Sequence, residues 1–198
     1  AIGAGLPISE ATGSMIVDIG GGTTEIAVMS LGGVVFSKSL RIAGDAMDGA
    51  IINYMRKKFN LLIGESTAEK IKKEIGTAIP TTNNIFLMKG RDIRTGTPKE
   101  IALTEEDACE ALMPILNQML SAIKEALEST PPELSADLVD MGLVLTGGGA
   151  LLKNIDKLIS KDTGLPVTIA DNPLECVAIG TGKALENEEL FSTMMSEY

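Results

Sequence analysis

Two glycine triplets constrain the fold of this chain more than any other feature. Residues 20–22 and residues 147–149 are each three consecutive glycines, and each triplet follows a short apolar run typical of a β-strand. Consecutive glycines leave backbone N–H groups unobstructed by side chains, which suits them to surround a phosphate or to lie against a nucleotide. Neither triplet is decisive alone, but together, about 125 residues apart, they suggest one nucleotide held between two chain segments.

The composition limits both the class of protein and its chemistry. The chain has 198 residues, of which 44% are hydrophobic but only 3% aromatic, so we expect an aliphatic core in one or two domains. A formal net charge of −10 argues against a broad nucleic-acid surface, which needs clusters of Lys and Arg. The chain has no histidine, so any chemistry must depend on carboxylates, backbone amides and a hard cation. Its two cysteines, Cys109 and Cys176, are expected to be free thiols.

A β-meander is predicted near the start of the chain. Residues 15–19, 25–29 and 34–40 have the character of strands, joined by the first glycine triplet and by Gly32-Gly33. A P-loop or a dinucleotide-binding fold instead has a glycine loop that opens a helix. The first triplet therefore indicates a different class of phosphate loop.

Helical periodicity predicts two helices after the meander. The first begins at Gly44 with Asp45 as its N-cap and runs to about residue 59. The second begins at Ser66, whose spacing to Glu69 matches a capping box, and ends before Gly76. The segment that follows, residues 77–103, is rich in turn formers and is expected to form a small strand pair or a loop.

A long amphipathic helix is predicted next, capped by residues 104–107 and ended by Pro131-Pro132. Pro114 lies inside it and is expected to kink the helix or to divide it. The remaining elements are predicted as a strand, a helix capped by Gly164, a second short strand and a last helix: residues 143–145, 150–161, 166–169 and 174–185.

Asp18 is the candidate ligand of a cation. It ends a predicted strand directly before the first triplet, so its carboxylate would face phosphates bound by the glycine amides and hold Mg²⁺, through water, because Mg²⁺ retains several waters. The alternative is that Asp18 caps a tight turn. Thr23 and Thr24 could donate hydroxyls to phosphate oxygens, although Thr is also a common strand residue.

The second triplet and the predicted second helix leave alternatives open. Residues 147–149 could let an adenine ring or a ribose phosphate pack against backbone, or could form an ordinary strand-to-helix turn, which does not need three glycines. Glu69 and Lys72 share a helix face, but spacing alone favours the capping role of Glu69 over a ribose-binding role.

The order of these elements resembles the second half of the actin-like ATPase fold, which is shared by actin, sugar kinases, heat-shock chaperone ATPases and bacterial filament proteins. The sequence Asp-Ile-Gly-Gly-Gly-Thr-Thr-Glu at residues 18–25 is similar to the second phosphate loop of that fold, and Leu-Thr-Gly-Gly-Gly-Ala-Leu-Leu at residues 145–152 to its adenosine loop. Further segments narrow the resemblance to the MreB family of bacterial actin homologues: residues 41–45, 63–76, 130–134 and 164–167.

The resemblance implies an α/β fold of the ribonuclease H-like class, a mixed sheet flanked by helices with a small α+β insertion. Residues 1–37 and 101–172 would form core subdomain IIA, and residues 38–100 the inserted subdomain IIB. Residues 173–198 would be a helix and tail that return to a first domain, IA. The first phosphate loop, the catalytic glutamate and a membrane-inserting segment would precede Ala1, so this chain is expected to be a fragment without a catalytic residue.

The resemblance also implies ATP and Mg²⁺ as ligands, with Asp18 as the partner of the metal. The role of Glu69 is then reversed, because the family places this helix beside the nucleoside. The implied nucleotide-binding residues are Gly20, Gly21, Gly22, Thr23, Thr24, Glu69, Lys70, Ile71, Lys72, Gly147, Gly148, Gly149, Ala150 and Leu151.

The implied function is that of a cytoplasmic, membrane-associated ATPase that polymerises head to tail into filaments, organises cell-wall synthesis and maintains rod shape. Its implied partners are further copies of itself, the membrane proteins of cell shape and wall synthesis, and the inner face of the cytoplasmic membrane, but no nucleic acid. Two alternatives share the fold. A sugar or acetate kinase would need a substrate pocket beside the cleft, and a heat-shock-type chaperone ATPase would need a larger insertion and a substrate-binding domain.

Overall fold

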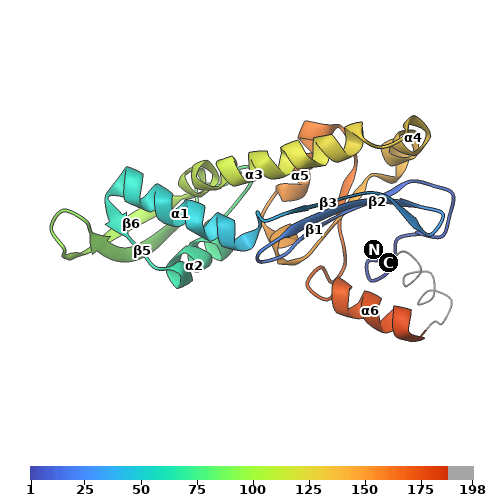
Figure 1. The fold of residues 1–198 in the computed structure, drawn as a ribbon. Helices are drawn as coiled ribbons and strands as arrows, with labels where there is room; N and C mark the ends of the chain where they lie inside the picture. The colour runs from blue at the N-terminus through green and yellow to red at the C-terminus, as the bar shows by residue number, and fades with distance from the viewer. Residues whose placement is uncertain (187–198) are drawn as a thin grey trace.

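The computed structural model describes residues 1–186, which form two β-sheets with helices packed around them (Figure 1). The larger sheet has the strand order β3-β2-β1-β7-β8 and the smaller one the order β4-β5-β6. The strands of the larger sheet are β1 (Ser14–Ile19), β2 (Thr24–Ser30), β3 (Gly33–Leu40), β7 (Leu143–Thr146) and β8 (Val167–Ile169). Those of the smaller sheet are β4 (Leu61–Leu62), β5 (Ile85–Asp92) and β6 (Pro98–Thr104).

The larger sheet is mixed, and its topology places the two glycine triplets together. Strands β1, β2 and β3 form the predicted antiparallel meander, whereas β1 and β7 run parallel, with Asp18 opposite Thr146. Parallel neighbours have their carboxyl ends at the same edge of a sheet. The triplets that follow β1 and β7 therefore lie side by side, although they are far apart in sequence.

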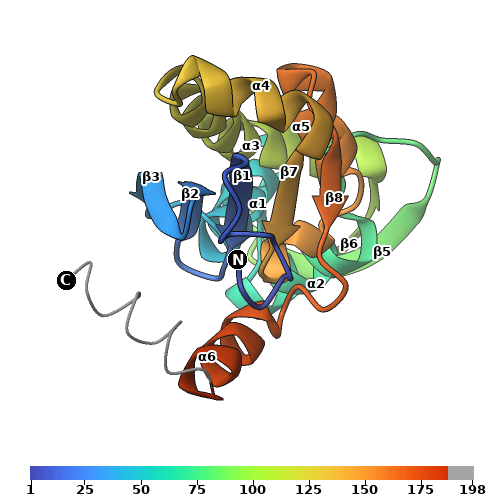
Figure 2. The same cartoon turned by 90° about the vertical axis from the view of Figure 1, so that its right-hand side faces the viewer.

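Helices cover both sides of the larger sheet, while α1 and α2 pack beside the smaller sheet (Figure 1). Figure 2 shows α3, α4 and α5 on one side and α6 on the other, and Figure 1 shows α3 running past both sheets. The helices are α1 (Gly44–Phe59), α2 (Glu65–Ile75), α3 (Glu105–Glu128), α4 (Pro132–Met141), α5 (Ile155–Thr163) and α6 (Cys176–Glu186). A short 3₁₀ turn, η1 (Gly148–Leu151), contains part of the second glycine triplet.

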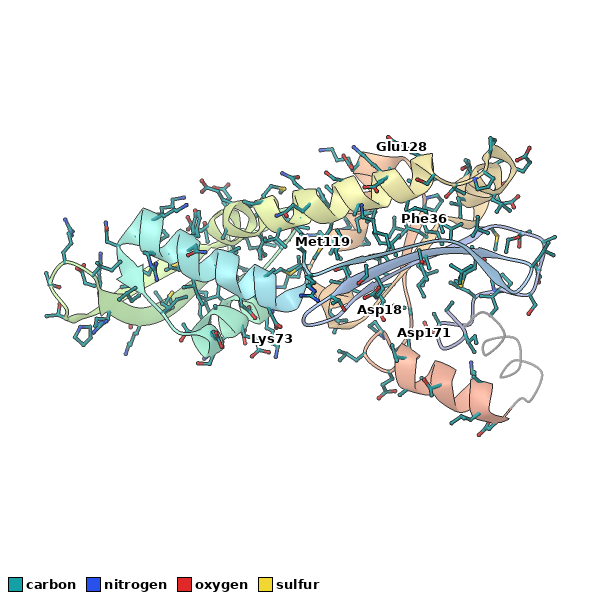
Figure 3. All side chains as sticks on the ribbon, in the orientation of Figure 1. Asp18, Phe36, Lys73, Met119, Glu128 and Asp171 are labelled. Atoms are coloured by element: carbon teal, nitrogen blue, oxygen red, sulfur yellow. The ribbon has the colours of Figure 1, made fainter. Side chains whose placement is uncertain are left out.

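The core is aliphatic, as the composition predicts. The predicted apolar stripe of α3 is buried at Leu112, Leu116, Met119 and Ile123, and Figure 3 shows Met119 between α3 and the sheet. Both cysteines are free and buried, which confirms the expected thiols. Among the described residues, no helix is both long and apolar enough to cross a membrane.

The expected side-chain caps of α1 and α2 are wrong. The N-cap of α1 is Ala43, and the first N–H groups of α1 bond to the first glycine loop: Gly44 N–H to Gly20 O (3.1 Å) and Asp45 N–H to Gly21 O (2.8 Å). These bonds satisfy donors that a capping side chain would otherwise serve. Helix α2 begins at Glu65 after Gly64, which places Ser66 inside its first turn, where it cannot cap. By contrast, the predicted cap of α3 at residues 104–107 is confirmed, and it takes the form of a capping box between Thr104 and Asp107.

The predicted end of the long helix before Pro131-Pro132 is confirmed, and of the two possibilities predicted for Pro114, division of the helix is ruled out. Helix α3 continues through Pro114 without division, and Pro114 is exposed, so water can satisfy the carbonyl that loses its intrahelical partner. Pro131-Pro132 ends α3, but Pro132 also begins α4, a helix that the sequence reading did not predict. Proline is well tolerated at the first position of a helix because that N–H has no intrahelical partner.

The segments around the second triplet also differ in part from expectation. The helix predicted for residues 150–161 begins only at Ile155, because Asn154 adopts a left-handed conformation (φ 59°) that separates α5 from η1. Gly164 does cap its C-terminus in a left-handed conformation. Residues 77–103 contain the strand pair β5–β6, one of the two predicted possibilities. The last helix is α6, and the tail predicted beyond it, residues 187–198, lies outside the described residues.

Candidate functional site

One cleft of about 950 Å³ collects both glycine segments. Its walls are the first glycine loop, the start of α1, one face of α2, the second glycine turn and the start of α6. A volume of this size lies within the usual range of small-molecule and cofactor sites. The lining residues are Asp18, Gly20, Gly21, Gly44, Asp45, Met47, Asp48, Glu65, Ser66, Glu69, Lys72, Lys73, Gly76, Gly147, Gly148, Gly149, Leu151, Leu152, Lys153, Pro173, Leu174 and Val177.

The first glycine loop presents bare backbone to the cleft. It is closed by a hydrogen bond from Gly20 N–H to Thr23 O (2.9 Å). A β-carbon on Gly21 would have no neighbour nearer than Asp45 Oδ1, at 3.7 Å. No protein atom therefore crowds the position above this loop, and a ligand can approach its backbone.

The second glycine turn owes two of its three glycines to packing. Gly147 has φ +80°, and a β-carbon there would lie 2.3 Å from Ile19 O. A β-carbon on Gly149 would lie 2.2 Å from Ile19 Cγ2. Only Gly148 is exposed. The atom nearest to a β-carbon on Gly148 would be Leu174 Cδ2, at 3.1 Å. The triplet thus lets β7 and η1 close against the end of β1 and leaves one bare glycine facing the cleft.

Asp18 lies at the meeting point of the two glycine segments. Burial raises the pKa of its carboxyl group, while a hydrogen bond with Thr146 acts in the opposite direction. A carboxylate that is partly removed from water gains from a nearby cation. Within residues 1–186, no three Cys, His, Asp or Glu side chains gather into a metal site.

Helix α2 carries two different ion pairs on its cleft side. Lys73 Nζ lies 2.6 Å from Glu69 Oε1 within the helix, and this exposed pair lowers the pKa of Glu69. Lys72 Nζ instead crosses to α1, where it lies 2.9 Å from Asp48 Oδ2. Burial raises the pKa of Asp48, and the hydrogen bond from Lys72 opposes that shift. Figure 3 shows Asp18 and Lys73 on the side of the molecule where α6 lies.

Of the sequence-predicted site residues, eight line the cleft: Gly20, Gly21, Glu69, Lys72, Gly147, Gly148, Gly149 and Leu151, together with the predicted metal ligand Asp18. Six do not line it: Gly22, Thr23, Thr24, Lys70, Ile71 and Ala150. Gly22 and Thr23 belong to the first glycine loop but are exposed outside the cleft. Thr24 is fully buried and donates its hydroxyl to Ile42 O (2.7 Å). Ile71 and Ala150 belong to the core, and the Lys70 ammonium lies over the ring of Phe86.

The sequence reading missed several lining residues. Asp45 and Asp48 lie on the first turns of α1, Val177 lies on the first turn of α6, and Pro173 and Leu174 come directly before that helix. Their place at the cleft depends on how distant elements pack, for which no local pattern provides a signal. Lys73 is different, because its i,i+4 spacing from Glu69 predicts an ion pair on α2.

Comparison with known proteins gives consistent matches. The family model described as MreB/Mbl protein matches residues 1–193. The cell shape-determining protein MreB of Escherichia coli (strain K12) is 56% identical over 187 residues, which cover 94% of this chain and 54% of that protein. The cell shape-determining protein Mbl of Bacillus subtilis (strain 168) is 47% identical over 188 residues, covering 94% of this chain and 56% of Mbl. The chain therefore spans about half the length of these relatives.

Solved structures match the fold as well. The crystal structure of MreB5 of Spiroplasma citri bound to AMPPNP superposes with a TM-score of 0.92 at 38% identity, covering 100% of this chain and 59% of that one. The double helical filament of MamK shares the fold, with a TM-score of 0.76 at 23% identity over 94% of this chain and 57% of the MamK chain.

Proposed function

Because this chain belongs to the MreB/Mbl family of cell shape-determining proteins, we propose that it is part of an ATP-binding bacterial actin homologue that assembles into filaments. The predicted family and the predicted actin-like fold are both confirmed. A sugar or acetate kinase and a chaperone ATPase are not favoured, because the relatives at 47–56% identity are MreB and Mbl proteins.

The observation that carries this proposal is the convergence of two bare glycine segments and the polar face of α2 on one cleft. Phosphates would lie against the exposed backbone at Gly20 and Gly21, and the adenosine against Gly148 and Leu151. Glu69 would face the nucleoside from α2. Crystal structures of MreB5 hold AMPPNP and ADP, which supports an adenine nucleotide as the ligand.

The residues of the cleft also fit a cation. The partly buried Asp18 carboxylate would hold Mg²⁺ through water at the junction of the two glycine segments. When bound, Mg²⁺ would offset the negative charge of the phosphates. Asp18 would orient the water shell of the ion, and the glycine amides would orient the phosphates.

The proposal extends to the organisation of the whole protein. Residues 1–37 and 101–172 would form subdomain IIA and residues 38–100 subdomain IIB, with α6 leading toward a first domain. Copies of the protein would join head to tail, a contact that propagates without closing and so produces filaments. These filaments would lie at the inner face of the cytoplasmic membrane, with membrane proteins of cell shape and wall synthesis as partners.

Calorimetry with Mg-ADP on the complete gene product that contains this chain tests the nucleotide site. Gly21→Val places a side chain over the first glycine loop at a position where its β-carbon has no protein atom nearer than 3.7 Å, so we expect the Mg-ADP affinity to fall about 10-fold or more. Gly49→Val is the matched control, since a β-carbon on Gly49 meets no atom within 4 Å and Gly49 does not line the cleft. Equal affinities for both variants would contradict the proposed site.

Sedimentation tests the assembly part of the proposal separately. We expect the complete gene product to pellet as filaments in the presence of ATP and Mg²⁺. If the protein binds Mg-ADP but stays in the supernatant at high concentration, the proposed nucleotide site stands and the proposed filament assembly is contradicted.

A further inference from the structure

Asp48 and Lys72 form a shielded ion pair between α1 and α2. Lys72 Nζ lies 2.9 Å from Asp48 Oδ2, and the two side chains are only 18% (Lys72) and 14% (Asp48) exposed. The same ammonium donates to the carbonyl oxygen of Gly44 (3.0 Å), the first residue of α1. If one partner of such a shielded pair is removed, the charge of the other partner is left poorly compensated, which is not the case when one partner of an exposed pair is removed.

Hydrogen bonds continue from this pair to the first glycine loop. Gly44 and Asp45 donate their N–H groups to the carbonyl oxygens of Gly20 and Gly21. A continuous connection therefore runs from Lys72 on α2, through the start of α1, to the backbone that presents Gly20 and Gly21 to the cleft.

We propose that Asp48 is a positioning residue for nucleotide binding: by holding Lys72 on Gly44, it sets the spacing between the cleft face of α2 and the first glycine loop. This inference rests on the proposed function, in which the nucleoside lies along α2 and the phosphates lie on the loop. A ligand that reaches both α2 and the first loop requires the correct spacing between them, whereas adenosine, placed on α2 and the second glycine turn, does not reach the first loop.

The geometry shows why Asp48 acts through Lys72. One carboxylate oxygen, Oδ2, is engaged by Lys72, and the other, Oδ1, is shut off from the surface with no hydrogen-bond partner. Oδ1 is thus closed to a ligand, and Oδ2 already accepts a bond from Lys72. Lys72 in turn uses two of its three N–H donors within the protein. Its ammonium is thus a link between elements, whereas Lys73 on the same helix is 70% exposed and bonds only within α2.

Opposite charges at the two positions make the proposal testable. If Lys72 served only as a free charge for phosphates, loss of the Asp48 charge would strengthen Mg-ADP binding and loss of the Lys72 charge would weaken it. If the pair sets the spacing, both losses weaken binding. Asp48→Glu distinguishes the two hypotheses as well. It keeps the charge, so a purely electrostatic effect would leave Mg-ADP affinity unchanged, but its side chain is longer by one methylene, so a change in spacing would weaken binding.

The experiment compares adenosine with Mg-ADP by calorimetry on the complete gene product. For Asp48→Asn, Asp48→Glu and Lys72→Met we expect Mg-ADP affinity to fall about 10-fold, while adenosine affinity changes by less than about 3-fold. Binding of adenosine also reports that each variant retains a folded cleft. The double variant Asp48→Asn/Lys72→Met should bind Mg-ADP no more weakly than either single variant, because the two residues act as one unit.

The pair Lys124–Asp162 provides a control with the same pair geometry away from the cleft, although its side chains are more exposed, at 50% and 30%. Its Nζ–Oδ2 distance is also 2.9 Å, it lies between α3 and α5, and it does not line the cleft. Lys124→Met and Asp162→Asn should leave both affinities unchanged. Tighter Mg-ADP binding by Asp48→Asn, or equal losses for adenosine and Mg-ADP, would overturn the inference. A wild-type protein that binds neither ligand would overturn the proposed function, and this inference with it.

Discussion

A β-carbon on Gly147 would lie 2.3 Å from the carbonyl oxygen of Ile19, so the second glycine turn closes on β1 only because residue 147 has no side chain. The backbone of Gly147, with φ 80° and ψ 169°, adopts a conformation that is essentially restricted to glycine. The edge of the sheet where the two glycine segments meet is therefore built on a close approach of two backbones.

Gly147→Ala is expected to destabilise the protein by about 2–4 kcal/mol, through backbone strain and overpacking together. Urea unfolding measures this loss. Gly21→Ala is the matched change in the first loop, where a β-carbon would make only an ordinary contact with Asp45 Oδ1 at 3.7 Å, and it should alter stability by less than about 0.5 kcal/mol. Equal losses for the two variants would show that the turn can relax away from β1.

Glu105 anchors the segment that leads into β5. Its buried carboxylate accepts hydrogen bonds from the Thr81 and Thr82 amides (3.0 Å each) and from the Thr82 hydroxyl (2.7 Å). Glu105→Ala leaves these donors without their acceptor, so we expect a loss of about 2–3 kcal/mol. Hydrogen exchange should show increased opening at Thr81 and Thr82, and a normal exchange rate there would contradict the anchoring role.

The same carboxylate predicts a pH dependence. Hydrogen bonds from Thr82 and Thr81 lower the pKa of Glu105 below its ordinary value of about 4.3. Its contribution is therefore fully present above that value and is lost as the pH falls through the lower pKa of the folded state. Unfolding free energies measured from pH 6 downward should decline less steeply for Glu105→Gln than for the wild type. Parallel acid curves would argue against the assignment.

Asp18→Asn separates function from stability. Burial raises the pKa of Asp18, so the ionised carboxylate costs stability once the pH is above the folded-state pKa, and this cost disappears as the pH falls through it. We therefore expect Asp18→Asn to be at least as stable as the wild type at pH 7, but to bind nucleotide with little dependence on Mg²⁺. Calorimetry with and without Mg²⁺ checks this. An unchanged Mg²⁺ dependence would remove Asp18 from the metal site.

Asn154 joins the segment after the second glycine turn to residues 77–79. Its amide donates to Thr77 Oγ1 (3.2 Å) and to Ile79 O (2.9 Å), and its φ is 59°. Asn154→Ala loses both bonds and strains the backbone, for an expected cost of about 2–3 kcal/mol. Asn154→Gly also loses both bonds, but glycine adopts the left-handed conformation without strain, so its loss of stability should be smaller than that of Asn154→Ala. Thermal unfolding compares them, and an Ala variant no less stable than the Gly variant would contradict the strain.

Local patterns predicted the elements whose causes are local. The meander follows from alternating strands and glycine turns, and the capping box between Thr104 and Asp107 spans only three positions. The expected caps at Asp45 and Ser66 follow the same local logic and are wrong. The start of α1 bonds to the first glycine loop instead, and α2 begins before Ser66. A capping pattern cannot reveal that a distant backbone already satisfies the same donors.

The sequence by itself determined the two glycine segments, the carboxylate at Asp18 and the family. Only the tertiary structure decided which residues share the cleft. In the folded protein, the side chains of Thr24, Ile71 and Ala150 are buried away from the cleft, and Asp48 pairs with Lys72. The physical reason is that strand and turn propensities act between near neighbours in sequence, whereas these contacts depend on how α1 crosses α2 and on the parallel pairing of β1 with β7.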